Sequence, residues 1–230
     1  APLDKRALEG LDSDRPFEVR AVGRIALRTL AGSIGVQATQ LPVLQRADRW
    51  MVLSGSGGIT LTPQRADLYA KLTVDGAYIN FDNLRANRSL PNDVVVTRAG
   101  AQRKATTTAP VDVALDVKGN LGQRFYIEGA GLEARLAGEV NLSGRPSQLR
   151  AEGSVRTVDG VYAGYGQRLQ IERGIVTFLG PVDNPALNVL AVRSGLPVEV
   201  GVAIGGTAQR PLVRLHSDPA MSDTEKLNWL

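Results

Sequence analysis

The residues that could perform acid–base or nucleophilic chemistry are few and poorly arranged for it. His216 is the only histidine, it lies close to Asp218, and the chain has no cysteine. A serine nucleophile activated by His216 would need a strained strand-to-helix turn, and no G-x-S-x-G segment is present. Asp112 and Asp116 lie beside Lys118 on one predicted solvated face, without the contrasting environments that paired acid–base carboxylates require. We therefore predict no catalytic residue and no enzymatic activity.

Metal and nucleotide sites are not predicted either. Without cysteine, and with one histidine, the chain lacks thiolate zinc ligands and histidine clusters. Residues 129–134 match a Gly-x-Gly-x-x-Ala loop, but a dinucleotide site also needs a surrounding βαβ unit, and no such alternation is seen. The glycine-rich segment 54–58 lacks the Lys-Ser/Thr ending of a phosphate loop and reads as a turn or a flattened strand. We expect no cofactor and no metal.

The charge pattern does not favour nucleic acid as a partner. The formal net charge is +4, and aromatic residues make up 5% of the chain. Arginines alternate with apolar residues, whereas a nucleic-acid binder shows a basic stripe with interleaved aromatic side chains. The basic residues are interpreted as solvated strand faces.

The elements that must position these side chains are predicted to be strands. Apolar residues recur with period two over 68–74, 111–117 and 198–204, and most of the residues between them are polar or small. This alternation gives a strand one apolar and one polar face. Turn residues separate the runs at Ser54 to Gly58, Asp75-Gly76, Gly144-Arg145-Pro146, Asp159-Gly160, Gly180-Pro181, Asp183-Asn184-Pro185 and Gly205-Gly206. Many short strands with regular turns indicate an antiparallel all-β fold.

The apolar phase changes once, near residues 173–174. Leu169 and Ile171 are at odd positions, whereas Val176 and Phe178 are at even positions. A tight turn or a β-bulge between them would return both pairs to one face.

Two windows also suit a helix, because residues of one kind recur every four positions: Arg20, Arg24 and Arg28, and Leu132, Leu136 and Val140. Glycines interrupt both windows, and both also satisfy period two. We interpret both as strands.

A short helix is predicted only at the C-terminal end. Pro219 breaks the last strand. Residues 222–225 then have the spacing of a capping box, in which the Ser222 side chain accepts a hydrogen bond from the Glu225 amide. Leu227 and Leu230 would share one face of this helix, with Trp229 beside them.

We predict one elongated β-domain over residues 1–230, with possible flexible connections at 85–91 and 99–110. The chain starts at Ala1, without a basic-then-apolar signal segment and without a run of about 18 apolar residues. We therefore expect a fragment of a larger protein, whose membrane anchor or export signal lies outside it.

The role of the apolar strand faces stays open on composition alone. They would form the core of a closed sandwich, or they would line an open groove for acyl chains. Small residues such as valine and alanine dominate, and aromatic anchors are few, which favours neither.

From Asp159 onward the sequence resembles the C-terminal domain of the TamB family, within the AsmA-like envelope proteins. The resemblance lies in the run DGVYAGYGQRLQIERGIVTFLGPVDNPAL and in the closing segment RPLVRLHSDP at 210–219. Upstream, residues 41–42 with Trp50, the segment LPNDVVV at 90–96, and residues 125–136 also fit. The resemblance covers about residues 15–230. It departs at the end, because this chain stops at Leu230 where family members continue.

The resemblance implies a periplasmic location, an inner-membrane anchor elsewhere in the protein, and a taco-like curved sheet with an apolar inner face. It implies transport of phospholipid between the inner and outer membranes, and docking on an outer-membrane barrel of the TamA type. The alternative is an adaptor in outer-membrane protein assembly that binds a barrel by strand augmentation. The groove lining would be Val111, Val113, Leu115, Val117, Phe125, Ile127, Leu132, Leu136, Val140, Leu142, Leu169, Ile171, Val176, Phe178, Val198, Val200, Val202 and Ile204.

Overall fold

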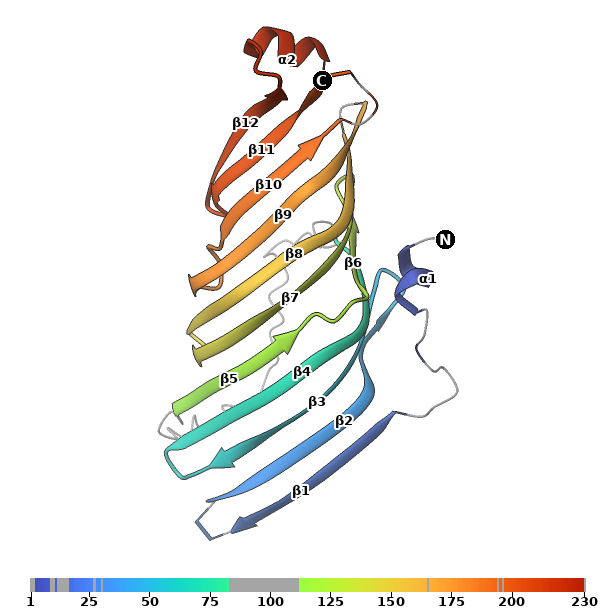
Figure 1. Cartoon of the computed structure of the whole chain (residues 1–230). Coiled ribbons are helices and arrows are strands. Elements are labelled where there is room, and N and C mark those ends of the chain that lie inside the picture. The colour runs from blue at the N-terminus through green and yellow to red at the C-terminus, as the bar shows by residue number, and fades with distance from the viewer. Residues whose placement is uncertain are drawn as a thin grey trace, which may run out of the picture.

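Period-two alternation produces long strands, which pair into one twelve-stranded sheet in the computed structural model (Figure 1). The structure describes residues 3–8, 11, 17–26, 28–29, 31–82, 112–164, 166–193, 195 and 197–229. The predicted flexible connections at 85–91 and 99–110 lie outside these residues. The elements are α1 (Leu3–Leu8), β1 (Glu18–Ala26), β2 (Ala31–Arg46), β3 (Arg49–Leu61), β4 (Arg65–Asn80), β5 (Asp112–Asn120), β6 (Phe125–Gly129), β7 (Leu132–Arg145), β8 (Gln148–Gly164), β9 (Gln167–Pro181), β10 (Ala186–Val192), β11 (Glu199–Thr207), β12 (Arg210–Asp218) and α2 (Asp223–Trp229).

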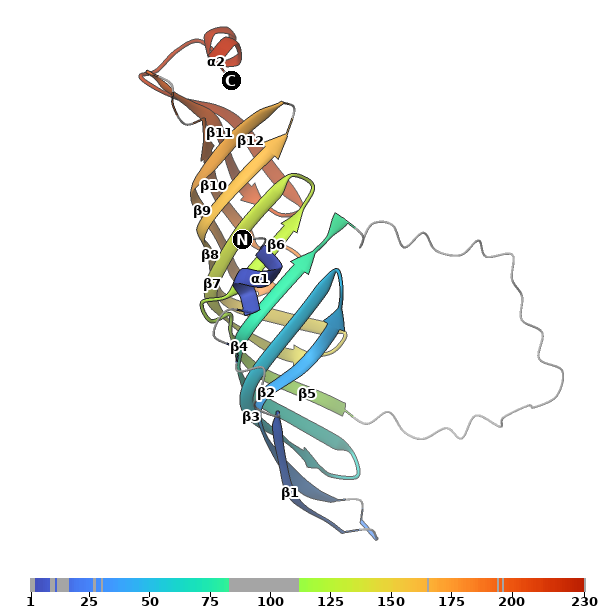
Figure 2. The same ribbon diagram turned by 90° about the vertical axis from the view of Figure 1, so that its right-hand side faces the viewer.

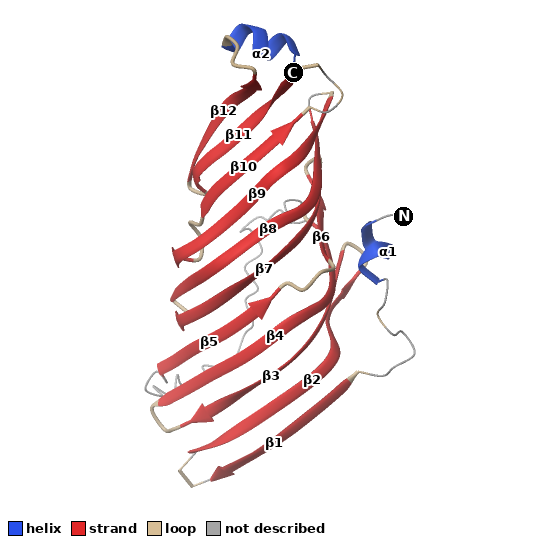
Figure 3. Cartoon of the chain, viewed as in Figure 1, coloured by secondary structure: helices blue, strands red, loops and turns tan. Residues whose placement is uncertain are grey.

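The all-β prediction is confirmed, and strand dominates the chain (Figure 3). Of the two windows that also suited a helix, the one from Leu132 to Val140 lies in β7. In the other, Arg20 and Arg24 lie in β1, whereas Arg28 is in the turn that follows. Glycine is costly inside a helix, whereas cross-strand pairing tolerates it where another backbone comes close. No helix among the described residues is long and apolar enough to cross a membrane.

Strand order follows the chain, except that β6 also lies between β4 and β7, beyond the end of β5. Neighbouring strands pair antiparallel along the sheet, but β4 pairs parallel with both β5 and β6. Parallel neighbours need a long crossover connection, and residues 81–111 separate β4 from β5 in the sequence. The prediction of a purely antiparallel sheet is therefore wrong at β4, because short turn signals contain no information about a crossover.

Pairing register aligns apolar residues from strand to strand. Ile34 of β2 pairs with Ile59 of β3, which pairs with Leu68 of β4, which pairs with Leu115 of β5. Directly paired residues project to the same side of a sheet. We call the side that carries these four residues the apolar face. On the other side, Lys71 pairs with Lys118 in the same two strands.

The apolar face is not the core of a closed sandwich. All twelve strands belong to one sheet, so the described strands form no second sheet over it. Figures 1 and 2 show a long, bent sheet, with α2 at its β12 end and α1 beside β4 and β6 in its middle. Among the described residues, Val200 is the one large side chain that is fully buried. A small cluster of Trp50, Tyr78 and Tyr126 adds packing where α1 lies against β4 and β6.

β-Bulges bend the long strands. Register shifts leave one extra residue in β4 at Asp75, in β8 at Val158, and in β9 at Glu172. The phase change near 173–174 is therefore a bulge and not a turn. Predicted turns at Asp75-Gly76 and Asp159-Gly160 are wrong, because both pairs lie inside strands at these bulges.

Two other glycine-rich segments are also strand. Gly205-Gly206 lies within β11, so the turn predicted there is wrong; the chain turns at 208–209. Residues 54–58 lie within β3, so of the two readings the flattened strand is confirmed. A Cβ on Gly57 would lie 2.6 Å from the carbonyl oxygen of Tyr69 in the neighbouring strand, so glycine there allows close strand approach.

The bend in β3 and β4 is fixed by a small polar network. Ser54 donates its hydroxyl to Asp75 Oδ2 at 2.6 Å and accepts the Gln40 amide at 2.9 Å. Arg124 Nε donates to the Asp75 carbonyl oxygen at 2.9 Å. The network thus joins bulged positions in β2 and β4 through the hydroxyl of one serine in β3.

Removing that hydroxyl is expected to lower stability. Ser54→Ala leaves the Gln40 amide and the Asp75 carboxylate without this partner, which should cost about 1–3 kcal/mol. Ser56→Ala, on the same side of β3 but exposed, should change stability by less than about 0.5 kcal/mol. Urea denaturation of both variants measures the difference, and equal midpoints would show that the network does not support the bend.

The capping box predicted for α2 is confirmed. The Glu225 amide donates to Ser222 Oγ at 3.3 Å, and the Ser222 amide donates to Glu225 Oε2 at 3.0 Å. Hydrogen bonds from the Ser222 side chain, and then from its backbone, lower the pKa of Glu225 below its ordinary 4.5. Pro219 follows the last residue of β12, as predicted.

α2 is expected to lose order in acid. Because the pKa of Glu225 is lowered on folding, its contribution is fully present above pH 4.5 and is lost as the pH falls through the lowered value. A helix this short is marginal alone, so its amides should exchange faster with deuterium at about pH 3 than at about pH 6, after correction for intrinsic rates. Ser222→Ala should remove most of this difference, and unchanged protection across the range would contradict the assignment.

Candidate functional site

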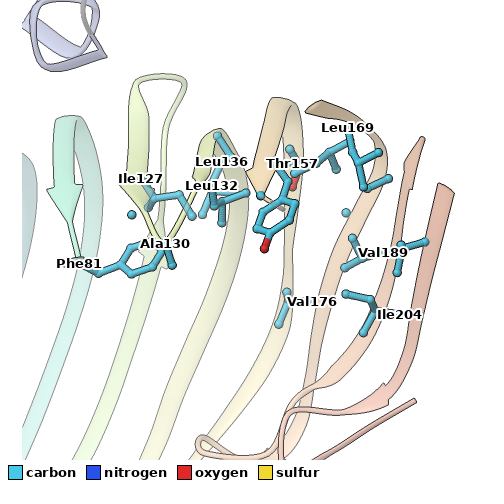
Figure 4. Close-up of a pocket in the computed structure, with 18 of the residues that line it drawn as sticks. Phe81, Ile127, Ala130, Leu132, Leu136, Thr157, Leu169, Val176, Val189 and Ile204 are labelled. Atoms are coloured by element: carbon cyan, nitrogen blue, oxygen red, sulfur yellow. The ribbon is translucent and has the colours of Figure 1, made fainter. Parts of the chain in front are cut away.

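A cavity of about 730 Å³ lies on the apolar face between β6 and β12. Eight of the predicted groove residues line it: Ile127, Leu132, Leu136, Leu169, Ile171, Val176, Val202 and Ile204. They come from β6, β7, β9 and β11, and Figure 4 shows several of them gathered around one hollow. The bulge in β9 explains why Ile171 and Val176, which differ in parity, both reach it.

The other predicted residues lie outside the cavity wall. Register aligns six of them with the apolar face in the neighbouring part of the sheet: Val113, Leu115 and Val117 of β5, Val140 and Leu142 of β7, and Phe178 of β9. Phe125 pairs with Leu136 on β7, and Val198 lies in the bend before β11. Val111 lies outside the described residues.

Val200 lies on the same side of β11 as Val202 and Ile204, but it does not line the cavity. It pairs with Ser217 of β12, and the next pair on the same side of these two strands is Val202 with Leu215. Its exposed fraction is 0%, at the end of the sheet where α2 lies against β11 and β12. On this side of β11, Val202 therefore lines the cavity, whereas Val200 is buried by packing.

Sequence reasoning missed several wall residues. The apolar ones among them include Phe81, Ala130, Ala134, Val155, Val189, Ala191 and Val213, and the polar ones are Thr157, Tyr162 and Gln167. Alternation within β8 would have found Val155 and Thr157, but the bulge at Val158 moves Tyr162 to the same side. No local signal shows that Phe81 lies beside Gly129; this proximity comes from the parallel pairing of β4 and β6.

The hairpin between β6 and β7 forms one end of the wall. Ala130 and Gly131 both have positive φ, of 50° and 82°, as in a two-residue type I′ turn. The Ala163 amide donates to the Gly131 carbonyl oxygen at 2.7 Å. A Cβ on Gly131 would overlap the carbonyl oxygen of Ala163. The Gly-x-Gly-x-x-Ala segment is therefore a tight hairpin packed against β8, not a loop before a helix.

The cavity wall contains no charged side chain. Charged groups nearby pair on the opposite face or at strand ends: Arg135 Nη2 lies 2.7 Å from Asp159 Oδ2, and Arg145 Nε lies 2.8 Å from Asp112 Oδ1. A wall of aliphatic groups with three uncharged polar side chains suits an apolar ligand with a small polar part.

His216 lies away from the cavity. It pairs with Gly201, so it projects to the side opposite Val202. Its Nε2 lies 3.0 Å from Glu199 Oε1, and both side chains are partly exposed. No cluster of three possible metal ligands occurs within the described ranges.

The sequence of this chain is similar to that of a known protein family. A family model described as TamB C-terminal domain matches residues 17–230. "Translocation and assembly module subunit TamB" from Haemophilus influenzae is 25% identical over 187 residues, which cover 75% of this chain. The match covers 14% of that relative's length.

Proposed function

The chain belongs to the TamB C-terminal domain family, and from this premise we propose that it is a segment of a lipid-transfer conduit. Its membership supports a role in a translocation and assembly module. In the proposal, the acyl chains of phospholipids lie along the apolar face as the lipids move between the inner and outer membranes. The cavity between β6 and β12 is one of the places where they bind.

One observation carries this proposal: the apolar face is aligned across strands and stays open, with an uncharged cavity on it. Burial contributes about 0.8 kcal/mol for each CH₂ group removed from water. An acyl chain in the cavity would therefore be held strongly, while its charged headgroup stays outside, because burying a charge without a partner is costly.

Movement along such a face needs no chemical step. As an acyl chain slides from one strand to the next, the apolar area it buries stays nearly constant, so the barrier to sliding is low. Direction must come from lipid gradients or from the remainder of the protein. The conduit needs no catalytic residue and no cofactor.

The proposal also assigns the chain to the periplasm, within a protein anchored to the inner membrane. Its outer-membrane partner in the proposal is a barrel of the TamA type. These assignments complete the proposed path, because lipid that leaves the apolar face must enter a membrane.

A second function is favoured by the edges of the sheet. β1 and β12 each have one neighbour in the described sheet, and every residue of β1 is exposed. An unpaired strand edge can accept another strand. The chain would then act as an assembly adaptor that binds barrel strands.

Native mass spectrometry of the purified chain separates the two functions. The conduit predicts bound masses that match phospholipids, which are lost when Val176 is replaced by Lys in the cavity wall and kept when Thr177 is replaced by Lys on the opposite side. A lipid-free chain that captures unfolded barrel strands would overturn the conduit and support the adaptor.

A further inference from the structure

Three polar side chains interrupt the apolar wall of the cavity, and all come from one hairpin. Thr157 and Tyr162 lie on β8, and Gln167 begins β9. Each is partly buried. Because β8 and β9 together supply about half of the wall, these groups lie on the side that a bound ligand contacts most.

These three side chains are available to a ligand. Within the part of the chain that the structure describes, no side-chain hydrogen bond joins Thr157, Tyr162 or Gln167 to another residue. In the open cavity these partly buried hydroxyls can reach water. A ligand that excludes this water without bringing an acceptor would leave them unpaired, which costs free energy.

Glycines set the positions of the two hydroxyls. Gly174 lies opposite Thr157, and a Cβ there would overlap Thr157 Oγ1. A Cβ on Gly164 would lie 2.6 Å from Tyr162 Oη, and Gly164 pairs with Gln167 next to the turn. Thr157 is therefore next to the bulge of β8, whereas Tyr162 Oη lies beside Gly164, next to the turn between β8 and β9.

The chemistry of the wall selects the acceptor. With no charged side chain in the cavity, the wall offers a phosphate no ion pair, whereas its hydroxyls can donate hydrogen bonds to a neutral acceptor. An ester carbonyl is neutral, accepts hydrogen bonds, and lies between the acyl chains and the headgroup of a glycerolipid. A lipid with its tail in the cavity and its headgroup in water must place its esters near the rim.

We propose that Tyr162 and Thr157 form an ester-recognition site, where their hydroxyls donate hydrogen bonds to the carbonyl oxygens of ester-linked acyl lipids. Gln167 extends this polar track to the rim. The site makes the cavity selective for acyl esters over plain hydrocarbon chains. It rests on the proposed lipid conduit, and it adds a chemical specificity that apolar burial alone does not provide.

The test compares two phosphatidylethanolamines with equal chain lengths, one with ester links and one with ether links, which lack the carbonyl oxygens. The unaltered chain should bind the ester lipid more tightly, by about three- to tenfold for each hydrogen bond. In Thr157→Val/Tyr162→Phe, the ester lipid should bind as weakly as the ether lipid, and binding of the ether lipid should change little.

The matched control is Thr177→Val/Tyr69→Phe, which removes the same two hydroxyls from the opposite side of the sheet. It should keep the ester preference. If the double variant in the cavity does not fold, Tyr162→Phe alone decides. Equal binding of both lipids to the unaltered chain would overturn the ester site and leave the conduit standing, whereas binding of neither lipid would overturn both.

Discussion

Val202→Asp is expected to abolish lipid binding while the sheet stays folded, and Val200→Asp is expected to unfold the C-terminal strands. The two residues lie on the same side of β11, but Val202 lines the open cavity and Val200 is fully buried. An Asp at position 202 keeps contact with water and places a charge on the acyl path. An Asp at position 200 has no such access, and burying it costs several kcal/mol against a typical total stability of about 5–15 kcal/mol.

Circular dichroism melts and phospholipid co-purification measure both effects. Val202→Asp should retain a cooperative β-sheet transition without bound lipid. Val200→Asp should lower the melting temperature by about 10–20 °C or remove the transition. Ala203→Asp, one position along β11 on the other side, should retain both folding and lipid. If Val202→Asp unfolded like Val200→Asp, the cavity would be closed packing.

Gly131→Ala is the second change with a large expected effect. The added methyl group would overlap the Ala163 carbonyl oxygen, and the residue would keep a φ of 82°. Left-handed strain costs about 1–2 kcal/mol, and displacement of packed neighbours adds about 1–3 kcal/mol. We expect a loss of about 2–5 kcal/mol in unfolding free energy, together with weaker lipid binding, because this hairpin carries part of the cavity wall.

Gly166→Ala provides the matched control for the strain. Gly166 has a similar φ of 78°, in the next hairpin on that side, but a Cβ there would meet nothing within 4 Å. It should lose only the strain, about 1–2 kcal/mol. Chemical denaturation of both variants isolates the effect of the overlap, and equal losses would show that the contact of Gly131 with β8 does not hold the wall.

The alternation of apolar and polar residues predicted most of the strands, because a sheet with one apolar side has apolar residues at every second position of its strands. Eight of the residues that it assigned to the groove line the cavity, and their role in binding lipid stays a prediction. The alternation failed where a strand bends: Asp159-Gly160 has the composition of a turn, yet it continues β8, because pairing with Arg135 and Ala134 of β7 outweighs local turn preference. The same bulge hid Tyr162, whose parity differs from that of Thr157.

Other features of the fold cannot be predicted from the residues next to them in the sequence. The parallel pairing of β4 with β5 and β6 joins strands that are far apart in the sequence, and it brings Phe81 to the cavity. Val200 could not be told from Val202 by alternation, because its burial comes from packing at the end of the sheet. The sequence therefore predicts which side of a strand is apolar, but not which part of that side stays open.

Site-specific photocrosslinking to lipid tests the conduit most directly. Photoreactive residues would replace Leu68 and Val176 on the apolar face, and Lys71 and Thr177 on the other side, since the chain without cysteine is easily given single labels. The conduit predicts phospholipid adducts at positions 68 and 176 and none at 71 and 177. Equal adducts on both sides, or none at either apolar position in lipid-loaded protein, would contradict it.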